Sequence, residues 1–569
     1  MAFMLKLSAE VLEEAFIQPI RFAMLLDDQF PVYKDFAGGG VSTYDFARAT
    51  SLFNLCRDRG WLCDVDNRAK IAANFDNDKH LHQSDLLILD FHLDQTNSSD
   101  PSEALRILQK LSHSHHFNLV LVYTSEEANS VIRDIAYCLG AGLIREDQST
   151  QASAALTGLS DETIDDLKEL INSTILTKFL SGNSFMDEAK VMRSALEGEG
   201  VPARLHLPII SKLCSEFFED RVAPDVAKAR PKNAKVVGDY KDNSDVKWLV
   251  CENVFVAVAN KRETDPKDIL DNLKAGLAAW NPTVLQVMMI HARSALEKIG
   301  NLSDAAVLSD PARQAGWLLP ILLAESSTEK TNEVVELYRR LFNRLIDEIS
   351  PTMVDLGGRL VAAGEFHPVE ASKFLAQSTS LSDKDVYHAL NEHLCSEAHK
   401  DGYMSTGLIF RDEASKEFWL CSTPACDLVP GRKTGRGLDP WLPISAVKLT
   451  PIKNHAAIVE NLQNAEIGNH IFVRDDGKPI VLEALEPQSR QMVIETLVLK
   501  DEGVIVGNRF SGCRSEISDG IPTWKDRNFI VIGRLRTAYA DRLLAFSGNQ
   551  RARIGVDFVN MPTPFAEKA

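Results

Sequence analysis

The sequence lacks several features that would place it in a particular class. It has no long run of Lys or Arg, and its formal net charge is -18. An acidic chain repels phosphate backbones, which disfavours a nucleic-acid partner. The longest apolar stretch, near residues 317–324, is too short to span a bilayer. The nine cysteines have no regular spacing, which argues against a disulfide framework and suits a reducing compartment. We therefore expect a cytoplasmic protein with neither a membrane nor a nucleic acid as its partner.

The common signatures of enzymes are missing as well. The chain contains no GxxxxGK[ST], no HExxH and no GxSxG. It has no internal repeat and no low-complexity segment. These absences favour a role other than that of a multiple-turnover enzyme, although they exclude only the classes that carry those motifs.

What is present divides the 569 residues into three regions. In residues 1–150, a short amphipathic helix precedes apolar strands that alternate with helical patterns. This alternation predicts a parallel sheet covered on both faces. Residues 151–400 are mainly helical in pattern. Residues 401–569 have short strands punctuated by Gly, Pro and Asp, which predicts a β-rich α+β domain. In the first region we expect strands at 20–26, 61–65, 85–90 and 118–124, and helices at 43–59, 101–111 and 126–139.

The later regions have weaker patterns. The apolar segment 247–260 predicts a strand or hairpin, and the polar segment 223–244 before it predicts a loop. Helices are expected at 161–177, 266–280, 282–299, 328–349 and 383–399. In the third region we expect strands at 407–410, 417–422, 470–474, 479–482, 503–506 and 528–535, and helices at 455–464 and 534–547.

Acidic residues end two of the predicted strands. Asp27 and Asp28 follow the first, and Asp90 follows the third. The carboxyl edge of an open α/β sheet is where ligands bind, so these side chains face one crevice. A hard cation such as Mg²⁺ relieves the repulsion between them, with Asp28, Asp90 and the carbonyl near His92 as ligands and Asp27 acting directly or through water. Asp90 is then a candidate nucleophile that forms an aspartyl phosphate. Thr124, at the end of the fourth strand, is a candidate hydroxyl donor to the phosphoryl group.

These segments resemble the response-regulator receiver family. The matching pieces are MLLDDQF, LLILDFHLD and LVLVYTS, within residues 18–147. The resemblance implies a flavodoxin-like, doubly wound domain in which Asp27 and Asp28 bind metal and Asp90 accepts a phosphoryl group from a sensor histidine kinase. It also implies that Thr124 is the hydroxyl switch.

The sequence departs from the family at two places. The family has a Lys near the end of its fifth strand, but the corresponding stretch here, GAGLIREDQ, has neither a Lys nor a following Pro. Arg145 is the cation nearby, so it joins Asp90 and Thr124 in the predicted site. The guanidinium group of Arg is planar and rigid, whereas the ammonium group of Lys is a point charge on a flexible chain. We therefore expect the replacement to change how the phosphoryl group is bound. The second departure is an expected insertion at residues 31–43.

Three interpretations of the whole chain stay open. The first is a phosphoacceptor without an output enzyme, acting with an effector protein in a two-component pathway. At this level the chain resembles the receiver components of Detocs-like bacterial anti-phage systems, which implies a phosphate sink. The second is an effector whose C-terminal hydrolase or nuclease site contains Cys421, Cys426, Asp427 and Arg432; the two thiols also suggest a metal site or simply buried packing. The third is a receiver-like or Rossmann-like scaffold without phosphotransfer.

The oligomeric state is also open. The predicted helix 328–349 has apolar residues at helical spacing. Such a stripe either forms intramolecular core or mediates association between copies of the chain.

Overall fold

The computed structural model describes residues 6–32, 44–67, 84–93, 100–114, 116–232, 234–299, 309–324, 327–362, 367–400, 402–428, 440–452, 470–486, 491–518 and 520–551. It divides into two compact units. The first contains residues 1–300 and 349–362, and the second contains residues 301–348 and 363–569. None of the described helices is long and apolar enough to cross a membrane.

The first unit is built on a seven-stranded sheet. Its order is β2-β1-β3-β4-β7-β6-β5. The first five of these strands run parallel, whereas β6 and β5 are antiparallel additions at one edge. The parallel part therefore has the 2-1-3-4-5 order of flavodoxin-like folds, as the sequence predicts. The strands are β1 (Phe22–Leu26), β2 (Leu62–Asp66), β3 (Leu86–Leu89), β4 (Asn118–Thr124), β5 (Val236–Asp239), β6 (Lys247–Cys251) and β7 (Val254–Asn260).

Both faces of the central strands are buried, which explains why these strands are apolar throughout. Every residue of β3 and β4 is buried. Met24, Leu87 and Val120 join the core cluster that contains α5 and α6. Phe255 on the opposite face stacks on Trp280 of α13. The helices that flank the sheet or precede it are α1 (Ala9–Leu12), the π-helical turn η1 (Glu13–Ile17), α3 (Phe46–Asp58), α5 (Ser102–Ser112), α6 (Ala128–Cys138), α13 (Ile269–Trp280) and α14 (Val284–Ile299).

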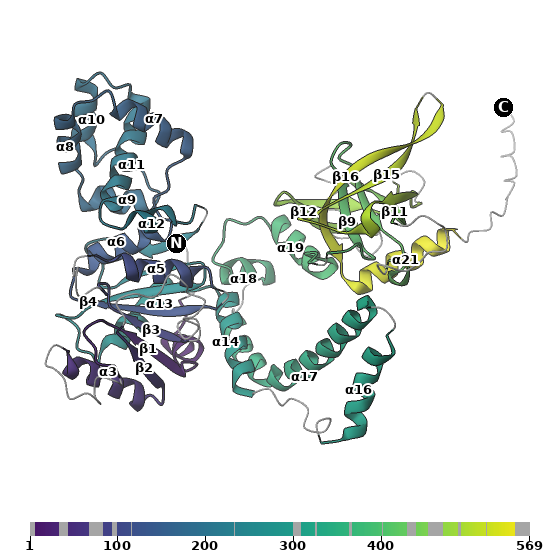
Figure 1. Ribbon diagram of the computed structural model, residues 1–569, viewed down its shortest axis with the longest axis horizontal. Coiled ribbons are helices and arrows are strands. Elements are labelled where there is room, and N and C mark those ends of the chain that lie inside the picture. The colour runs from purple at the N-terminus through teal and green to yellow at the C-terminus, as the bar shows by residue number, and fades with distance from the viewer. Residues whose placement is uncertain are drawn as a thin grey trace, which may run out of the picture. The chain divides into compact units, whose positions relative to one another are not determined.

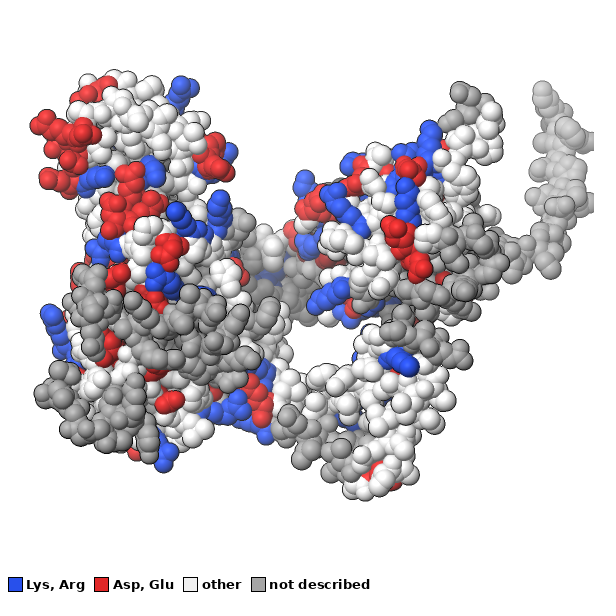
Figure 2. Space-filling view, viewed as in Figure 1, with Lys and Arg blue, Asp and Glu red and all other residues white. Residues whose placement is uncertain are grey.

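A helical insertion separates α6 from the last three strands. It contains α7 (Glu146–Leu156), α8 (Asp161–Glu169), α9 (Ser173–Leu180), α10 (Lys190–Gly198), α11 (Ala203–Glu219) and α12 (Pro224–Lys228). Its buried residues, such as Leu167, Ile209 and Phe218, belong to the same core cluster as α5 and α6. In Figure 1, α5 and α6 lie between the sheet and this insertion. Acidic side chains gather on the outer part of the insertion (Figure 2), where α8 carries Asp161, Glu162, Asp165, Asp166 and Glu169.

The structure changes several sequence-based expectations in this unit. The hairpin expected at 247–260 is present as β6 and β7, but it extends the sheet that begins with β1. That sheet therefore takes strands from both sides of residue 150, where a domain boundary was expected. The segment 223–244 holds α12 and β5 rather than only a loop. The single helix expected at 161–177 is two helices, because Asn172 caps a new one: its side chain accepts hydrogen bonds from Thr174 N and Ile175 N. The insertion expected at 31–43 lies mostly outside the described residues.

Several helices lie between the first sheet and the C-terminal strands in sequence. They are α16 (Pro311–Leu323), α17 (Ser327–Val361), α18 (Pro368–Leu375) and α19 (Asp383–Cys395). The helix expected at 328–349 continues through Pro351 to Val361. Ser382 caps α19, as the sequence predicts, by accepting a hydrogen bond from Asp385 N.

The second unit contains a closed antiparallel β-barrel. Its strands follow the order β10-β9-β16-β15-β14-β11, and pairing of β10 with β11 closes the ring. Trp419, Phe410 and Phe529 are among the side chains of its interior. β15 and β16 form a long hairpin that extends beyond the other strands (Figure 1). The strands of this unit are β8 (Ser396–Glu397), β9 (Leu408–Asp412), β10 (Phe418–Cys421), β11 (Leu442–Pro451), β12 (His470–Asp475), β13 (Lys478–Glu483), β14 (Ile494–Leu499), β15 (Arg509–Ser518) and β16 (Ile521–Leu535).

The β-rich prediction for this region is confirmed, with local differences. The strand expected at 503–506 is a short 3-10 turn, η4 (Asp501–Gly503), followed by isolated bridges. A second such turn, η3 (Ala425–Asp427), follows β10. The helix expected at 534–547 begins later, as α21 (Thr537–Arg551), because β16 continues to Leu535. The helix expected at 455–464 lies outside the described residues.

Candidate functional site

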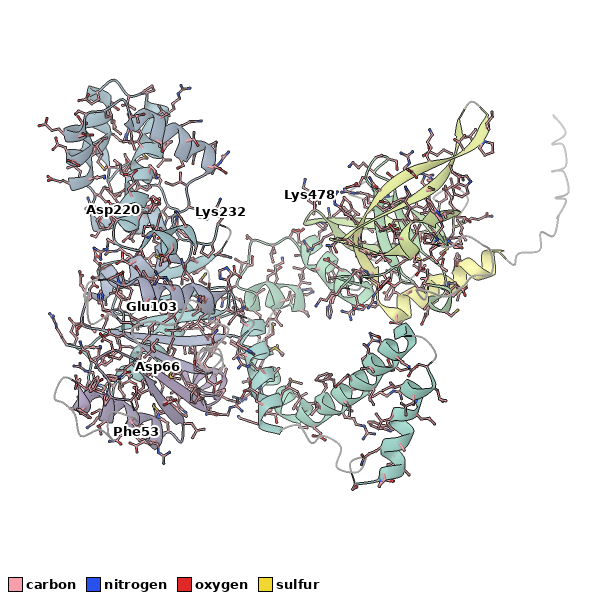
Figure 3. All side chains as sticks on the ribbon, in the orientation of Figure 1. Phe53, Asp66, Glu103, Asp220, Lys232 and Lys478 are labelled. Carbon is pink, nitrogen blue, oxygen red and sulfur yellow. The ribbon has the colours of Figure 1, made fainter. Side chains whose placement is uncertain are left out.

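Three carboxylates meet at the carboxyl edge of the first sheet. Asp27 and Asp28 follow β1 directly, and Asp90 follows β3. Because β1 and β3 are parallel neighbours, their ends lie side by side. Each of the three offers an oxygen within 4.8 Å of the others, and all three side chains are buried. Asp66, labelled in Figure 3, ends the neighbouring strand β2, and its carbonyl accepts a hydrogen bond from Asp27 N.

A lysine that the sequence analysis did not find lies between these carboxylates. Lys261 Nζ is 2.8 Å from Asp27 Oδ2 and 2.8 Å from Asp90 Oδ2. Its side chain is only 4% exposed. Lys261 directly follows β7, which pairs in parallel with β4, so the sheet brings it to the same edge as the aspartates. A hydrogen bond from Lys261 N to Thr124 O, at 2.7 Å, fixes the backbone there.

Burial and charge act in opposite directions on these groups. Burial, with repulsion from Asp90, raises the pKa of Asp27 to about 6, even though Lys261 acts to lower it. Burial acts to lower the pKa of Lys261, but attraction to Asp90 and Asp27 outweighs it and leaves that pKa above its ordinary value. Lys261 is therefore an ammonium ion at neutral pH, and it compensates only part of the negative charge around it.

Hydrogen bonds from the backbone orient the two carboxylates that Lys261 contacts. Asp27 Oδ1 accepts from Gln29 N at 2.9 Å, and Asp90 Oδ1 accepts from Phe91 N at 2.8 Å. The Oδ2 atoms of both residues point to the ammonium group. Thr124, at the end of β4, is fully buried, and its Oγ1 accepts from Glu126 N at 3.2 Å.

Comparison with known families agrees with this geometry. Residues 19–172 match the family model described as a response receiver domain. This part of the chain is a response receiver domain. The comparisons with curated proteins and with solved structures gave no match. The matched range ends before β7, so Lys261 lies outside it.

The acidic cluster of this receiver domain has the chemistry that Mg²⁺ requires. Mg²⁺ binds carboxylate oxygens and keeps several waters, so a few protein oxygens are enough. Among the described residues, the cluster brings three carboxylates together, and the ammonium group of Lys261 contacts two of them, Asp27 and Asp90. An additional cation would therefore relieve repulsion that Lys261 leaves uncompensated.

His92 extends the site away from the aspartates. Its Nε2 is 2.6 Å from Glu126 Oε2, and this hydrogen bond is the main cause that raises the pKa of His92. Arg221, just after α11 of the insertion, lies 3.4 Å from the other oxygen of Glu126 and 2.9 Å from Asp134 Oδ2. The His92 ring thus faces Glu126. A metal contact from this residue would have to come from its backbone carbonyl, as the sequence analysis expects.

Arg145 takes no part in the contacts around the aspartates. It precedes α7, its side chain is 77% exposed, and it forms an ion pair with Asp147 at 3.2 Å. The stretch GAGLIREDQ is not the strand next to β4, because the chain leaves the sheet there and enters the insertion. One sequence signal was available for Lys261: the buried run VFVAVAN before it has the same apolar character as β3 and β4. Because this run is far from β4 in the sequence, the pattern does not indicate that the two strands pair.

Among the described C-terminal candidates, Cys421, Cys426 and Asp427, no cluster comparable to that of the aspartates is found. Cys421 ends β10 inside the barrel, and burial raises the pKa of its thiol to about 11. Cys426 is exposed, and its Sγ is 3.6 Å from Asp427 Oδ1. Arg432 lies outside the described residues. A thiol as buried and as weakly acidic as that of Cys421 is suited to packing rather than to nucleophilic attack.

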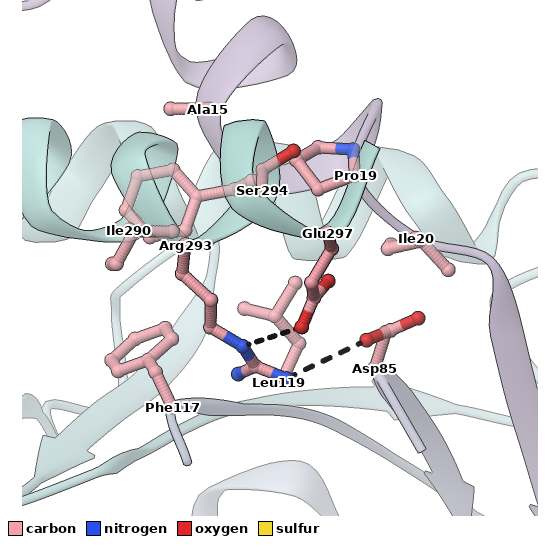
Figure 4. Close-up of a pocket in the computed structure, with 11 residues that line it drawn as sticks. Ala15, Pro19, Ile20, Asp85, Phe117, Leu119, Ile290, Arg293, Ser294 and Glu297 are labelled. Atoms are coloured by element: carbon pink, nitrogen blue, oxygen red, sulfur yellow. Dashed lines mark hydrogen bonds and ion pairs between the residues drawn. The ribbon is translucent and has the colours of Figure 1, made fainter. Parts of the chain in front are cut away.

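A pocket lies at the opposite edge of the first sheet (Figure 4). It is lined by residues at the starts of β3 and β4, including Asp85 and Leu119, and by Arg293 and Glu297 of α14. Arg293 is 3.0 Å from Glu297 and 4.0 Å from Asp85, so its charge is compensated within the pocket wall. The pocket holds about 40 Å³, which is room for only a few water molecules.

Proposed function

We propose that this protein accepts a phosphoryl group on Asp90 and that Lys261 is the cationic partner of that group. The observation that carries the proposal is the position of Lys261, which bridges Asp27 and Asp90 from a strand more than a hundred residues farther along the chain. A buried lysine between two carboxylates, within a larger acidic cluster, is typical of a functional site. Here it is positioned to bind the negative charge of a phosphoryl group.

The reaction is a displacement at phosphorus. An oxygen of Asp90 forms a bond to phosphorus while the bond from phosphorus to the donor nitrogen of a phosphohistidine breaks, and that nitrogen leaves with its electron pair. Asp27, Asp28 and Asp90, with the backbone carbonyl of His92, would hold Mg²⁺, which would neutralise part of the phosphoryl charge. Lys261 exchanges its contact with Asp90 Oδ2 for a contact with a phosphoryl oxygen.

Phosphorylation of Asp90 would affect the rest of the fold through Thr124. Its hydroxyl donates to a phosphoryl oxygen once Asp90 is modified, and this contact exists only in the phosphorylated state. Lys261 N is already bonded to Thr124 O, so the two residues move as neighbours. Glu126 and Arg221 then transmit the movement toward the insertion.

The test uses acetyl phosphate as the donor. The purified chain is incubated with Mg²⁺ and acetyl phosphate, and intact mass is measured. We expect the mass of one phosphoryl group on the wild type and none on Asp90→Asn. Asp475→Asn, which removes a largely buried carboxylate of the second unit, is the matched control and should be phosphorylated as the wild type is. Phosphorylation of Asp90→Asn to the wild-type level would contradict the proposal.

The partners follow from the same chemistry. A receiver domain takes its phosphoryl group from a histidine kinase or acts on an effector, and we propose a sensor histidine kinase as the donor here. We further propose that the protein acts as a phosphate sink in a phage-defence pathway, which is a more specific form of the phosphoacceptor role. It predicts that the phosphorylated protein draws phosphoryl groups from a kinase that has a second receiver, and a competition assay with two receivers measures this directly.

A further inference from the structure

The helices α16 and α17 expose an unusual amount of apolar surface. Eight large apolar side chains on α16 and on the part of α17 before Ile349 are between 43% and 75% exposed. In the space-filling view the surface of this region is mostly uncharged (Figure 2). The eight are Leu318, Leu319, Leu322 and Leu323 on α16 and Val335, Tyr338, Phe342 and Ile346 on α17.

These parts of the two helices also lack a core of their own, whereas the later part of α17 buries Ile349, Leu356 and Leu360. Among the residues described between 309 and 348, no apolar side chain is buried. One contact between the helices is the guanidinium of Arg344, which lies 5.2 Å from the centre of the Trp317 ring. In water, helices owe most of their stability to packing of an apolar face, so a pair this exposed requires a covering surface.

The exposed area matches what a second protein surface would bury. A large side chain presents on the order of 200 Å² when fully exposed, so eight at about half exposure present on the order of 800 Å². That area exceeds the largest patch expected on a typical monomer and equals one partner's share of a standard interface.

The charges on α17 favour a second copy of the same helix, running antiparallel. Close to Tyr338, Glu333 and Glu336 precede it, whereas Arg339, Arg340 and Arg344 follow it; Lys330 lies before this segment, and Asp347 and Glu348 lie after it. Glu336 and Arg340 are both well exposed. A two-fold axis near Tyr338 would place the acidic end of one α17 opposite the basic part of the other. Such a surface is self-complementary, as a two-fold interface requires.

We propose that a second copy of this chain covers the apolar face of α16 and α17, with the two α17 helices antiparallel about an axis near Tyr338. The dimer would be a four-helix arrangement made of two α16–α17 pairs. This inference does not depend on phosphorylation, and Asp90→Asn should dimerise as the wild type does.

The first test is the oligomeric state of the full chain by sedimentation velocity over a range of concentrations. One copy has a mass of 63.1 kDa, and we expect a species of twice that mass. Phe342→Glu buries a charge in the interface twice, once from each copy, and should raise the dissociation constant at least a hundredfold. Ile517→Glu, at a side chain that is 78% exposed on β15, is the control and should leave the constant unchanged.

The second test determines the direction of the helices. Tyr338→Cys should form a disulfide between copies under mild oxidation, because its two positions meet at the axis. Val354→Cys, also strongly exposed on α17, should not, because the two positions would be roughly 48 Å apart at 1.5 Å per residue. The wild type, with its own cysteines, sets the background.

Charge reversal gives a third readout. Glu336→Arg and Arg340→Glu should each weaken the dimer several-fold, and the double variant should recover most of the loss. A monomeric wild type at tens of micromolar would overturn the proposal, as would Phe342→Glu with unchanged affinity. Cross-linking through Val354→Cys would overturn the antiparallel arrangement. Circular dichroism of each variant checks that the chain is folded.

Discussion

Each of the two units contains a cluster of charged side chains, and the two clusters differ in how their charges are paired. At the edge of the first sheet, Asp27 and Asp90 both contact one ammonium group, that of Lys261, and Asp28 lies close to these two carboxylates. On the barrel of the second unit, two carboxylates face two cations. Glu417 contacts Lys448 at 2.5 Å and also pairs with Arg514, and Arg514 pairs with Glu495 at 2.8 Å.

The two clusters differ in how far the charges of their carboxylates are compensated by neighbouring cations, and not in the number of charged groups. The barrel network is balanced and partly exposed, and Arg514 also lies 4.7 Å from the centre of the Trp419 ring, so each charge has a structural partner. In the receiver cluster, burial and repulsion from Asp90 raise the pKa of Asp27 even though Lys261 contacts it, so its buried charge costs folding free energy unless it serves binding. This repulsion between buried carboxylates distinguishes the candidate site from an ordinary ion-pair network.

The largest expected effect comes from removing the lysine of each cluster. Lys261→Met removes the cation that contacts buried Asp27 and Asp90, and it should lower the free energy of unfolding of the first unit by about 3 kcal/mol in EDTA. Lys448→Met, whose side chain is 35% exposed, should cost the barrel less than about 1 kcal/mol. Hydrogen exchange of peptides from β4 and β14 reports the two units separately.

Added Mg²⁺ sharpens this comparison. It should restore part of the stability that Lys261→Met loses, because a divalent cation replaces the missing positive charge, and it should leave Lys448→Met unchanged. Equal losses in the two variants, or no response to Mg²⁺, would contradict the distinction between the clusters.

An effect of similar size is expected from pH. Burial raises the pKa of Asp134 to about 6, despite attraction from Arg221 and Arg133 and together with repulsion from Glu126. The folded state then binds this proton more tightly than the unfolded state, so stability increases as pH falls from 7 toward 4. The increase is on the order of 3 kcal/mol, from 1.36 kcal/mol per pKa unit. The gain should disappear in Asp134→Asn, as measured by hydrogen exchange of α6 at several pH values.

The barrel should respond in the opposite direction. Although burial acts to raise it, the pKa of Glu417 is held below its ordinary value by Lys448 and Arg514. Its contribution to stability is therefore present at neutral pH and is lost as pH falls through the folded-state pKa. The wild type should therefore lose more stability than Glu417→Gln when the pH is lowered. A smaller loss in the wild type than in Glu417→Gln would show that this assignment is wrong.

The smallest expected effect concerns Arg145. Arg145→Ala should change stability by no more than about 0.5 kcal/mol, because the side chain is 77% exposed. It should also leave the extent of phosphorylation by acetyl phosphate unchanged, whereas Lys261→Met should reduce it. If Arg145→Ala reduces phosphorylation as strongly as Lys261→Met does, Arg145 has a role that its position in the structure does not indicate.

Much of the fold follows from local patterns. The strands β1 and β4 agree with the apolar runs near residues 20–26 and 118–124, and the end of β3 places Asp90 where the sequence analysis expected it. The order of these motifs also sufficed to indicate a receiver domain. The barrel was predicted only as a β-rich region, because short strands with turn residues between them do not specify which strands pair.

The fifth parallel strand shows where local patterns fail. Its apolar run was recognised, but its neighbour β4 is far away in sequence, and the six helices of the insertion lie between them. Sequence proximity instead suggested Arg145. The pairing of β7 with β4 depends on burial of both sheet faces by distant helices, which no local window contains.

The sequence by itself determined the types of elements and the candidate site residues: apolar strands that end in Asp27, Asp28, Asp90 and Thr124. Their proposed roles rest on residue type and on position at strand ends, both of which are local. Only the tertiary structure decided which cation joins them, because Lys261 reaches Asp27 and Asp90 through long-range parallel pairing of β7 with β4.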